Sequence, residues 1–333
     1  YTLAGSLLML VAILACYLHP GSSFDIGRLS ASLPSMDPSA QKALFLAFAI
    51  AFAIKVPLFP FHTWLPDAHV EAPTAGSVVL AAVLLKMGAY GFLRFAIPFF
   101  PAAASAFATL MIVLSVISIV FGALMCMTQS DIKKLIAYSS VSHLGFVVLG
   151  IFSFTEAGAQ GAVLQMVNHG LSTGALFLLV GVIYDRTHRR GVDDFGGLAK
   201  PMPVYAAVFM IVTLSSIGLP GLNGFVGEFL VLKGSFEASR AAAALAALGV
   251  ILGAVYMLRL YRDMFWGPVT SPRNEKLLDL TGLEKAALAP LVALIFLLGI
   301  KPDFVLRRTA AAVEASLRSV SRQAPVEASH DRR

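Results

Sequence analysis

Charged residues are scarce in this chain. Of its 333 residues only 13% are Asp, Glu, Lys or Arg, whereas 58% are hydrophobic and the mean hydropathy is +0.80. A soluble domain averages about 25% charged residues, so this chain has too few to cover a surface that faces water. The charges cluster between apolar runs of about 20 residues, the length that a membrane-spanning helix needs. The composition predicts an integral membrane protein, an all-α polytopic helix bundle.

Further absences exclude several kinds of site. The two cysteines, Cys16 and Cys126, both lie in apolar runs without C-x-x-C spacing, which argues against an iron–sulfur cluster or structural zinc. There is no Walker loop and no G-x-G-x-x-G after a strand, so we expect no nucleotide site. The net charge of +6 comes mostly from loops and the tail, which indicates topology and lipid headgroups rather than nucleic acid. We expect no metal or cofactor in this chain.

The apolar runs predict nine spans. Their residues are roughly 2–18, 41–60, 74–97, 104–127, 133–152, 158–184, 203–235, 241–265 and 283–300. Residues 301–333 are predicted to form a polar, Ala-rich tail that consists of a partly amphipathic helix followed by a disordered end. Eleven Lys or Arg fall in the loops of one side and five in those of the other. This bias places the first side in the cytoplasm and the C-terminus on the opposite side.

Three ionisable residues fall well inside apolar spans: Lys55, Lys86 and Glu228. Each such charge costs roughly 2.5–3.5 kcal/mol at the centre of a spanning helix, and three cost on the order of 8–10 kcal/mol. A purely structural span has no reason to keep them, so the default interpretation is a pathway for ions or protons. The alternative is that Lys and Glu pair inside the bundle as structural contacts, or that Lys reaches the interface.

Helix breakers accompany two of these charges. Lys55 is followed by prolines and Glu228 is preceded by a Pro-Gly pair; the breaking residues are Pro57, Pro60, Pro220, Gly221 and Gly224. Broken helices at membrane depth are tolerated where they line a polar cavity. Lys55 is expected near the C-terminal end of a half-helix and Glu228 in the first turns of another, where the helix dipole favours a cation and an anion, respectively.

Two histidines, His143 and His169, lie inside other spans. A lone intramembrane histidine is often a hydrogen-bonded bridge between helices. Two at mid-depth, near Lys86, suggest steps along a Lys–His–Lys–Glu chain linked by water, since histidine titrates near neutral pH. Nearby polar residues expected to orient such waters are Ser139, Ser140, Ser142, Asn168 and Ser172.

The loop from Phe61 to Gly76 carries His62, Asp67, His69 and Glu71. Histidine and carboxylate side chains are metal ligands. These four do not fall on one helical face, because Pro66 and Pro73 interrupt the register. We therefore expect this loop to lie at an interface or at the mouth of a pathway.

Four stretches carry a family resemblance: "KVPLFPFHTWLPDAHVEAPTAGSVVLAAVLLKMGAYGFLRF", "QSDIKKLIAYSSVSHLGF", "QMVNHGLSTGALFLL" and "GLPGLNGFVGEF". They resemble the antiporter-like membrane subunits of respiratory complex I, from the first span to about residue 300. The resemblance implies a fourteen-helix fold with two inverted five-helix repeats, each with one broken helix. About five N-terminal helices of that fold would precede Tyr1. We therefore expect residues 1–300 to be an incomplete antiporter-like domain.

The same resemblance implies roles for single residues. Lys55 matches the broken-helix lysine of the first half-channel, and Lys86 matches the central lysine. Glu228 occupies the second broken helix, where L- and N-type relatives usually carry lysine, which favours the M-type branch. His143 and His169 match polar residues on the axis between Lys86 and Glu228.

The function that the resemblance implies is proton translocation in NADH:quinone oxidoreductase. NAD, FMN, iron–sulfur clusters and quinone would then lie on partner subunits, and homologous antiporter-like subunits and lipid would flank this chain. A bacterial inner membrane is expected rather than a mitochondrial one. Two alternatives stay open: a subunit of a multi-chain Na⁺/H⁺ antiporter or membrane-bound hydrogenase, and a structural scaffold whose buried charges only lock helices.

Overall fold

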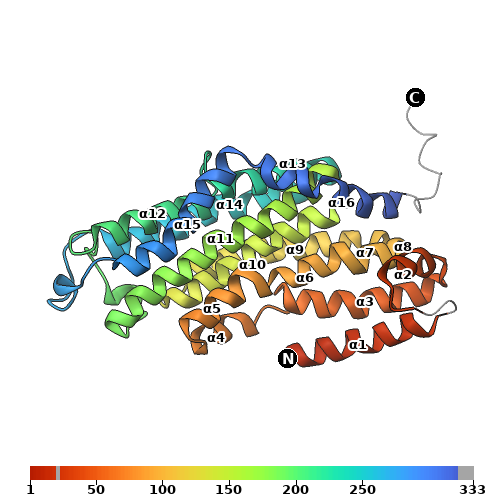
Figure 1. Cartoon of the computed structure of the whole chain (residues 1–333), viewed down its shortest axis with the longest axis horizontal. Helices are drawn as coiled ribbons and strands as arrows, with labels where there is room; N and C mark the ends of the chain where they lie inside the picture. Colours follow the sequence, from red (N-terminus) through yellow and green to blue (C-terminus); the bar gives the residue numbers. More distant parts are fainter. Residues whose placement is uncertain (20–22, 322–333) are drawn as a thin grey trace.

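The computed structural model describes residues 1–19 and 23–321, and this part of the chain is helical apart from loops and one isolated bridge between Asp131 and Gly191. Long helices run back and forth along the long axis of the molecule (Figure 1). The α-helices are α1 (Thr2–Leu18), α2 (Ile26–Ser32), α3 (Pro38–Lys55), α4 (Trp64–Glu71), α5 (Thr74–Val79), α6 (Lys86–Gly91), α7 (Ile97–Phe99), α8 (Pro101–Ala106), α9 (Ala108–Met127), α10 (Ile132–Phe152), α11 (Glu156–Thr187), α12 (Pro203–Ser216), α13 (Asn223–Ala238), α14 (Arg240–Phe265), α15 (Gly282–Ile300) and α16 (Asp303–Ser321).

The predicted membrane bundle is confirmed. Within the described residues, 7 helical stretches are long and apolar enough to cross a bilayer, among them the continuous stretch Thr74–Phe99 that contains α5, α6 and α7. Two shorter apolar helices, α1 and α12, account for the other predicted spans. The predicted boundaries agree with the observed ones to within a few residues.

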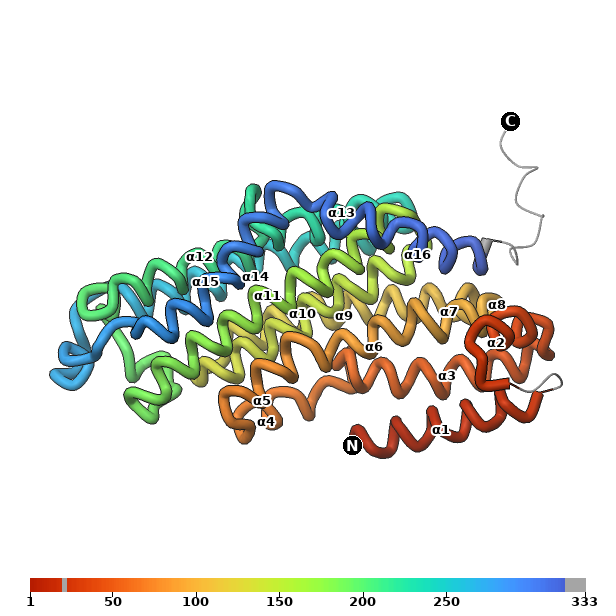
Figure 2. Tube along the Cα trace, in the orientation of Figure 1, coloured from red at the N-terminus to blue at the C-terminus, as the bar shows by residue number. Residues whose placement is uncertain are grey.

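The centre of the bundle is α10. In its apolar window 89% of the residues are buried, and α9, α11, α13 and α4 pack around it. The outer helices leave large apolar side chains uncovered: Leu3 and Leu7 of α1 and Ile251 of α14 are more than half exposed. Helices that are apolar on all sides are typical of a protein surrounded by lipid. The tube in Figure 2 follows this order from α1 through α3 and α6 toward α11.

Both predicted helix breaks are present. The first separates α3, which ends at Lys55, from α4, and Pro57 and Pro60 lie between them. The second separates α12 from α13, with Pro220 and Gly221 between them and Gly224 as the second residue of α13. Gly221 has φ +93°, a left-handed conformation that glycine adopts without the steric cost that a side chain would bring.

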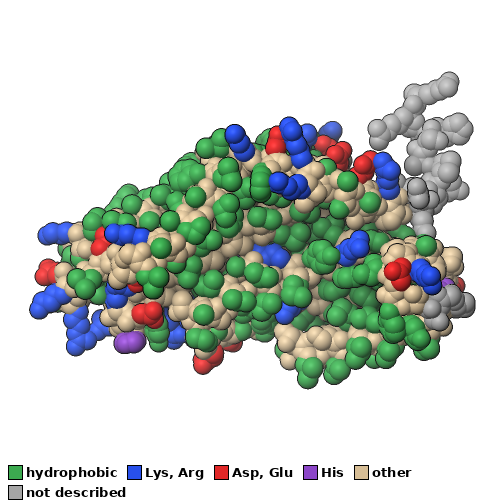
Figure 3. Space-filling view, viewed as in Figure 1, with side chains coloured by type: hydrophobic (Ala, Val, Ile, Leu, Met, Phe, Trp, Pro, Cys, Tyr) green, Lys and Arg blue, Asp and Glu red, His purple; other side chains and the backbone are tan. Residues whose placement is uncertain are grey.

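Charged side chains lie mainly at the ends of the bundle. Lys and Arg gather over the left-hand end in Figure 3, where α11 ends and α12 begins, while hydrophobic side chains dominate the middle. The C-terminal segment contains the expected helix, α16, which packs on the outside against α7, α8 and α11. Ser316 Oγ donates to the Leu93 carbonyl at 3.3 Å. The predicted disordered end, 322–333, lies outside the described residues.

Candidate functional site

Four titratable side chains from four helices meet in the interior. Lys86 begins α6, His143 lies on α10, His169 on α11 and Glu228 on α13. All four are buried, with exposed fractions between 2% and 9%. Ionisable groups withdrawn from water in this way must be paired or hydrogen-bonded, because an isolated buried charge is very costly. Each of the four side chains has such a partner.

Lys86 is held by a histidine and a backbone carbonyl. Its Nζ lies 2.6 Å from Nδ1 of His169 and donates to the carbonyl of Ala81. Residues Leu80–Leu84 form a π turn, in which the Leu85 N–H donates to Leu80, five residues back. In a regular α-helix the Leu85 N–H would donate to the Ala81 carbonyl. The π turn moves this hydrogen bond to Leu80, and the Ala81 carbonyl accepts from the Lys86 ammonium instead. π turns of this kind are frequent at functional sites.

Glu228 is held by a histidine and an amide. Its Oε1 lies 2.9 Å from Nδ1 of His143 and accepts a hydrogen bond from Nε2 of Gln165 at 3.1 Å. Gln165, which is buried on α11 one turn before His169, is not among the residues expected from the sequence. Its position four residues before His169 is the signal that would have identified it, because residues i and i+4 share one helix face.

The two hydrogen-bonded pairs face each other through their imidazole rings. The ring centroids of His143 and His169 lie 5.6 Å apart at an interplanar angle of 59°. Nε2 of His169 has no hydrogen-bond partner within residues 1–19 and 23–321. The order of groups is therefore Lys86, His169, His143, Glu228, with one step between the rings where a bridging water would complete the connection.

Amide groups fasten α13 to α11 beside this chain of groups. Nδ2 of Asn168 donates to the Asn223 carbonyl at 2.6 Å, and Nδ2 of Asn223 donates back to the Asn168 carbonyl at 3.3 Å. Ser215 Oγ donates to Oδ1 of Asn223 at 2.5 Å, and Ser172 Oγ donates to the Asn168 carbonyl. Asn168 and Ser172 thus act on backbone and amide groups that position Glu228.

In the part of the chain that the structure describes, Ser142 makes no hydrogen bond to the four titratable groups. Its hydroxyl donates to the carbonyl of Ile119 on α9 at 2.8 Å, away from the four titratable groups. Ser139 and Ser140 donate to the Ile136 carbonyl on their own helix. Back-bonding of this kind satisfies a buried hydroxyl locally.

Two glycines make room for Glu228. Gly218, at φ +73°, lies where a Cβ would come within 3.0 Å of Oε2 of Glu228. Gly227 lies where a Cβ would come within 2.3 Å of Oε1 of Gln165. A side chain at either position would displace the carboxylate or the amide that donates to it, so glycine at both positions permits the observed contact.

Lys55 lies apart from the four groups in the described contacts. It is the last residue of α3, as predicted, and it is partly buried. It lines a cavity of about 580 Å³ together with residues of α1, α2 and α6 that include Thr2, Ile26 and Met87. Lys55 therefore lies at a cavity beside α1 rather than in the chain of groups at Lys86.

His69 is an additional buried histidine. It is 0% exposed, stacks on Phe177 with centroids 4.4 Å apart, and neither ring nitrogen has a hydrogen-bond partner in the described part of the chain. Burial lowers the pKa of His69 to about 3, with smaller contributions from the positive charges of Lys133 and Lys86. Among the described residues no group of three or more His, Cys, Asp or Glu could hold a metal ion, and the loop that carries His62 and His69 is no exception.

Comparisons with known proteins agree with this arrangement. The family described as NADH:quinone oxidoreductase/Mrp antiporter, TM, matches residues 1–253. NADH-quinone oxidoreductase subunit M of Rhodobacter capsulatus is 50% identical over 315 residues, covering 92% of this chain and 62% of that protein. The subunit of that name from Mycobacterium tuberculosis is 41% identical over 333 residues, covering 98% of this chain and 60% of that protein.

Solved structures give the same result. A chain of respiratory complex I from Thermus thermophilus with bound NADH is 39% identical with a TM-score of 0.89, covering 96% of this chain and 68% of that one. A chain of the Mrp complex from Dietzia sp. shares the fold at 23% identity, with a TM-score of 0.85 and the same coverage of 96% and 68%.

The chain spans about 62% of the length of curated relatives such as the subunit from Rhodobacter capsulatus. These relatives are M subunits, the branch that Glu228 favours, and the predicted resemblance is confirmed. Most of them are bacterial, and the chain is an integral membrane protein as they are. Because the family model matches residues 1–253 and the fold is similar to that of a complex I chain, this protein belongs to the NADH:quinone oxidoreductase/Mrp antiporter transmembrane family.

Proposed function

We propose that this chain is part of a proton-translocating membrane subunit of NADH:quinone oxidoreductase, and that Lys86, His169, His143 and Glu228 carry the protons. The single observation that supports this most is the buried succession of these groups across four helices, with hydrogen bonds of 2.6 Å and 2.9 Å at its two ends. Titratable side chains inside a membrane protein are expensive and mark ion or proton pathways.

The proposed chemistry is a sequence of short proton steps. An amine and a carboxylate form the two ends, and each is hydrogen-bonded to its own imidazole. A proton leaving Lys86 has His169 as its acceptor, and a proton leaving His143 has Glu228. Imidazole suits the middle positions because it accepts a proton at one ring nitrogen while it releases another from the second.

Lys55 is assigned to the first half-channel, because it ends the first broken helix and lines the cavity beside α1. We take residues 1–300 as the proton-conducting domain and 301–333 as a tail outside it. α16 belongs to that tail, and its packing against α7, α8 and α11 is consistent with a role in fastening the exterior of the bundle.

The redox reaction belongs to other subunits in this proposal. NAD, FMN, iron–sulfur clusters and quinone would bind there, and coupling would reach this chain through adjacent membrane subunits, including homologous antiporter-like ones. The complex would lie in a bacterial inner membrane, with the C-terminus on the non-cytoplasmic side. The excess of Lys and Arg at one end of the bundle supports this orientation.

Replacing Lys86 with Met in the full-length subunit of the assembled complex tests the proposal. Proton uptake by inverted membrane vesicles is measured together with NADH oxidation. We expect assembly to persist and proton uptake per electron to fall, because the first acceptor-donor group of the chain is gone. The matched control is Lys133→Met, which removes another buried lysine whose Nζ donates to the Ala72 carbonyl at 2.9 Å.

The same experiment separates the alternatives. Unchanged proton uptake in Lys86→Met would refute the proposal. Failure of the complex to assemble in Lys86→Met, with Lys133→Met assembling normally, would favour the structural scaffold. A transport rate that follows Na⁺ concentration would favour a Na⁺/H⁺ antiporter, and electron transfer from a donor other than NADH would favour a hydrogenase-like complex.

A further inference from the structure

Three buried amide side chains lie between the second helix break and Glu228. Gln165 and Asn168 are on α11, Asn223 is the first residue of α13, and none of the three is more than 2% exposed. A side-chain amide has a donor end and an acceptor end. The end that faces a neighbour therefore decides whether that neighbour meets a hydrogen-bond donor or an acceptor.

The helix break holds the first of these amides. Ser215, the next-to-last residue of α12, donates from Oγ to Oδ1 of Asn223 at 2.5 Å. A Cβ at Gly224 would collide with the Ser215 carbonyl, so the start of α13 lies directly against the end of α12. Nδ2 of Asn223 donates to the Asn168 carbonyl at 3.3 Å. Asn223 is thus fixed to both α12 and α11.

The backbone carbonyl of Asn223 fixes the orientation of the Asn168 amide. A carbonyl oxygen only accepts hydrogen bonds, and Nδ2 of Asn168 donates to it at 2.6 Å. Turning the Asn168 amide around would bring two oxygen acceptors into contact. Oδ1 of Asn168 has no hydrogen-bond partner among the residues that the structure describes. A buried oxygen without a partner is costly, so it is the donor end that the surroundings select.

Asn168 in turn fixes the orientation of the Gln165 amide. Its Nδ2 also donates to Oε1 of Gln165 at 3.5 Å, a long hydrogen bond. The other end of the Gln165 amide, Nε2, then faces Glu228 and donates to its Oε1 at 3.1 Å. A reversed Gln165 amide would bring two N–H donors together at Asn168 and two oxygens together at Glu228.

The packing of α13 on α11 leaves room for the contact between the two amides. Gly227 lies opposite this contact, and a Cβ there would collide with both Oε1 of Gln165 and Nδ2 of Asn168. These are the two atoms that the long hydrogen bond joins. Glycine at this position therefore permits the orientation of both amides, one residue before Glu228.

We propose that Asn168 is a positioning residue for proton transfer, because it holds the Gln165 amide with its donor end toward Glu228. The inference rests on the proposed function, in which Glu228 carries protons, and it gives Asn168 a role other than orienting water. With Oε1 held by Gln165, the carboxyl group of Glu228 keeps the position in which it lies 2.9 Å from Nδ1 of His143.

Asn168→Leu in the full-length subunit of the assembled complex tests this role. Leucine has nearly the shape of asparagine but neither a donor nor an acceptor. Proton uptake by inverted vesicles is normalised to NADH oxidation and to the amount of assembled complex. With the Gln165 amide free to turn, we expect uptake through this subunit to fall toward that of Gln165→Met, which removes the donor itself. Loss of a hydrogen bond to a carboxylate corresponds to about 10- to 150-fold.

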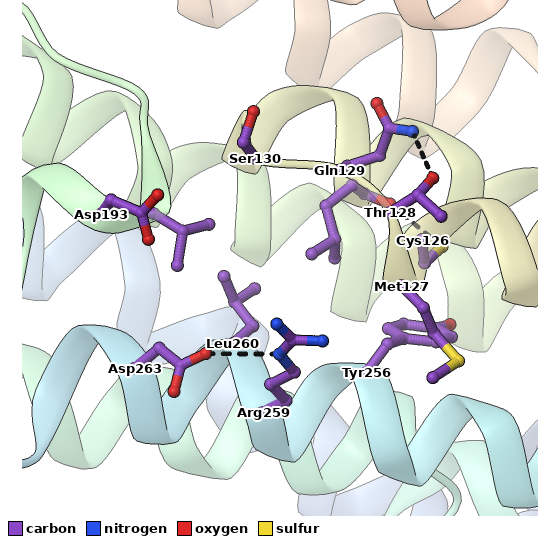
Figure 4. A pocket seen from close by; sticks show the side chains of 12 residues that line it. Cys126, Met127, Thr128, Gln129, Ser130, Asp193, Tyr256, Arg259, Leu260 and Asp263 are labelled. Carbon is purple, nitrogen blue, oxygen red and sulfur yellow. Dashed lines mark hydrogen bonds and ion pairs between the residues drawn. The ribbon is translucent and has the colours of Figure 1, made fainter.

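Asn274→Leu is the matched control. Asn274 is 2% exposed, and its Nδ2 likewise donates to a carbonyl, that of Asp194, at 3.0 Å and to a side-chain oxygen, Oγ1 of Thr270, at 3.5 Å. Asp193, the residue before Asp194, lines a polar cavity between the α9–α10 loop and α14 (Figure 4). The Asn274 amide thus holds a loop at the end of the bundle, and we expect uptake in Asn274→Leu to equal that of the wild type.

A double replacement distinguishes positioning from a purely structural role. If Asn168 acts through the Gln165 amide, Gln165→Met removes the group on which it acts. Adding Asn168→Leu to Gln165→Met should then cause no further loss of uptake, because the two residues work as one unit. Independent structural effects would instead multiply the two losses.

A further variant restores a donor without restoring the amide. Asn168→Asp keeps the shape of asparagine and carries an O–H donor when its carboxyl group is protonated. At the lowest pH at which the complex stays assembled, we expect Asn168→Asp to take up protons faster than Asn168→Leu. Asn168→Ala, which removes the same donor, replaces Asn168→Leu in every comparison if the leucine variant does not assemble.

Three results would overturn the inference and leave the proposed function intact, provided that Lys86→Met loses uptake. They are full uptake in Asn168→Leu, multiplied losses in the double variant, and equal uptake in Asn168→Asp and Asn168→Leu at the lowest pH. Full uptake in Lys86→Met would instead count against the proposed function itself.

Discussion

Replacing Gln165 measures how much the hydrogen bond from a single neutral donor stabilises the Glu228 carboxylate. Its Nε2 donates to Oε1 of Glu228 at 3.1 Å, and it is 2% exposed. Gln165→Met keeps an unbranched side chain of similar length and removes both the donor and the acceptor. Asn168, the other neighbour of the Gln165 amide, keeps its 2.6 Å bond to the Asn223 carbonyl, so the loss falls mainly on Glu228.

The size of the effect follows from the charge on the acceptor. A hydrogen bond to a charged group contributes about 1.5–3 kcal/mol. At about 1.4 kcal/mol for each factor of ten, loss of this hydrogen bond corresponds to a change of about 10- to 150-fold in an equilibrium constant. We expect proton uptake through this subunit to slow by a factor within that range, because the carboxyl end of the chain of groups loses one of its hydrogen-bond donors.

The assay is proton uptake by inverted vesicles, normalised to NADH oxidation and to the amount of assembled complex. Gln160→Met is the matched control, since Gln160 donates to Glu156 on the exposed part of the same helix and does not contact the interior. Uptake in Gln165→Met equal to that in Gln160→Met would refute the view that the Gln165–Glu228 contact supports transport.

Two predictions concern stability rather than transport. Arg186 donates to both carboxylate oxygens of Glu284 at 2.7 Å and to three backbone carbonyls. Arg186→Lys loses the bidentate contact with Glu284. We expect this substitution to destabilise the protein by about 2–3 kcal/mol, measured by thermal unfolding of the purified complex. Arg189→Lys, at a more exposed pair, should show almost none. The pKa of His69 is about 3 in the folded protein and about 6.5 in the unfolded chain. The folded state therefore favours the neutral imidazole. The contribution of His69 to the free energy of unfolding is complete above about pH 6.5 and falls as the pH decreases. His69→Phe should therefore lessen the loss of stability between about pH 6.5 and 4.5 by about 2–3 kcal/mol, and equal pH dependence in both proteins would contradict the assignment.

The arrangement of spans was predictable because bilayer thickness fixes helix length and because Pro and Gly mark interruptions. The runs around Lys55 and Glu228 carry both signals, and both helix breaks lie where the prolines predict them. The π turns on either side of Lys86 were not predictable. Their sequences, "LAAVL" and "FLRFA", contain no Pro or Gly that would mark an irregular turn.

The titratable groups of the site were predictable one at a time, since an isolated charge in an apolar run is conspicuous. Their supporting contacts were not. Ser142 is adjacent to His143 in sequence, yet neighbours on an α-helix point about 100° apart. Ser142 therefore faces Ile119 on α9 while His143 faces Glu228. Gln165, four residues from His169, shares its helix face and contacts the site, so periodicity is a better guide to partnership than adjacency.

In the proposed pathway an amine and a carboxylate form the two ends of the chain of groups, and this pairing limits which combinations of charge the interior tolerates. When Lys86 and Glu228 are both ionised, each has a hydrogen-bonding imidazole beside it at 2.6 Å and 2.9 Å. When one proton has crossed from Lys86 to Glu228, both are neutral and no buried charge remains. Intermediate states place a single charge on His169 or His143, whose rings lie 5.6 Å apart. At that separation the energy of two like charges is about 3 kcal/mol for an effective dielectric constant near 20. Double occupancy of the histidines is thus disfavoured, so the proposed pathway predicts that protons cross this part of the bundle one at a time.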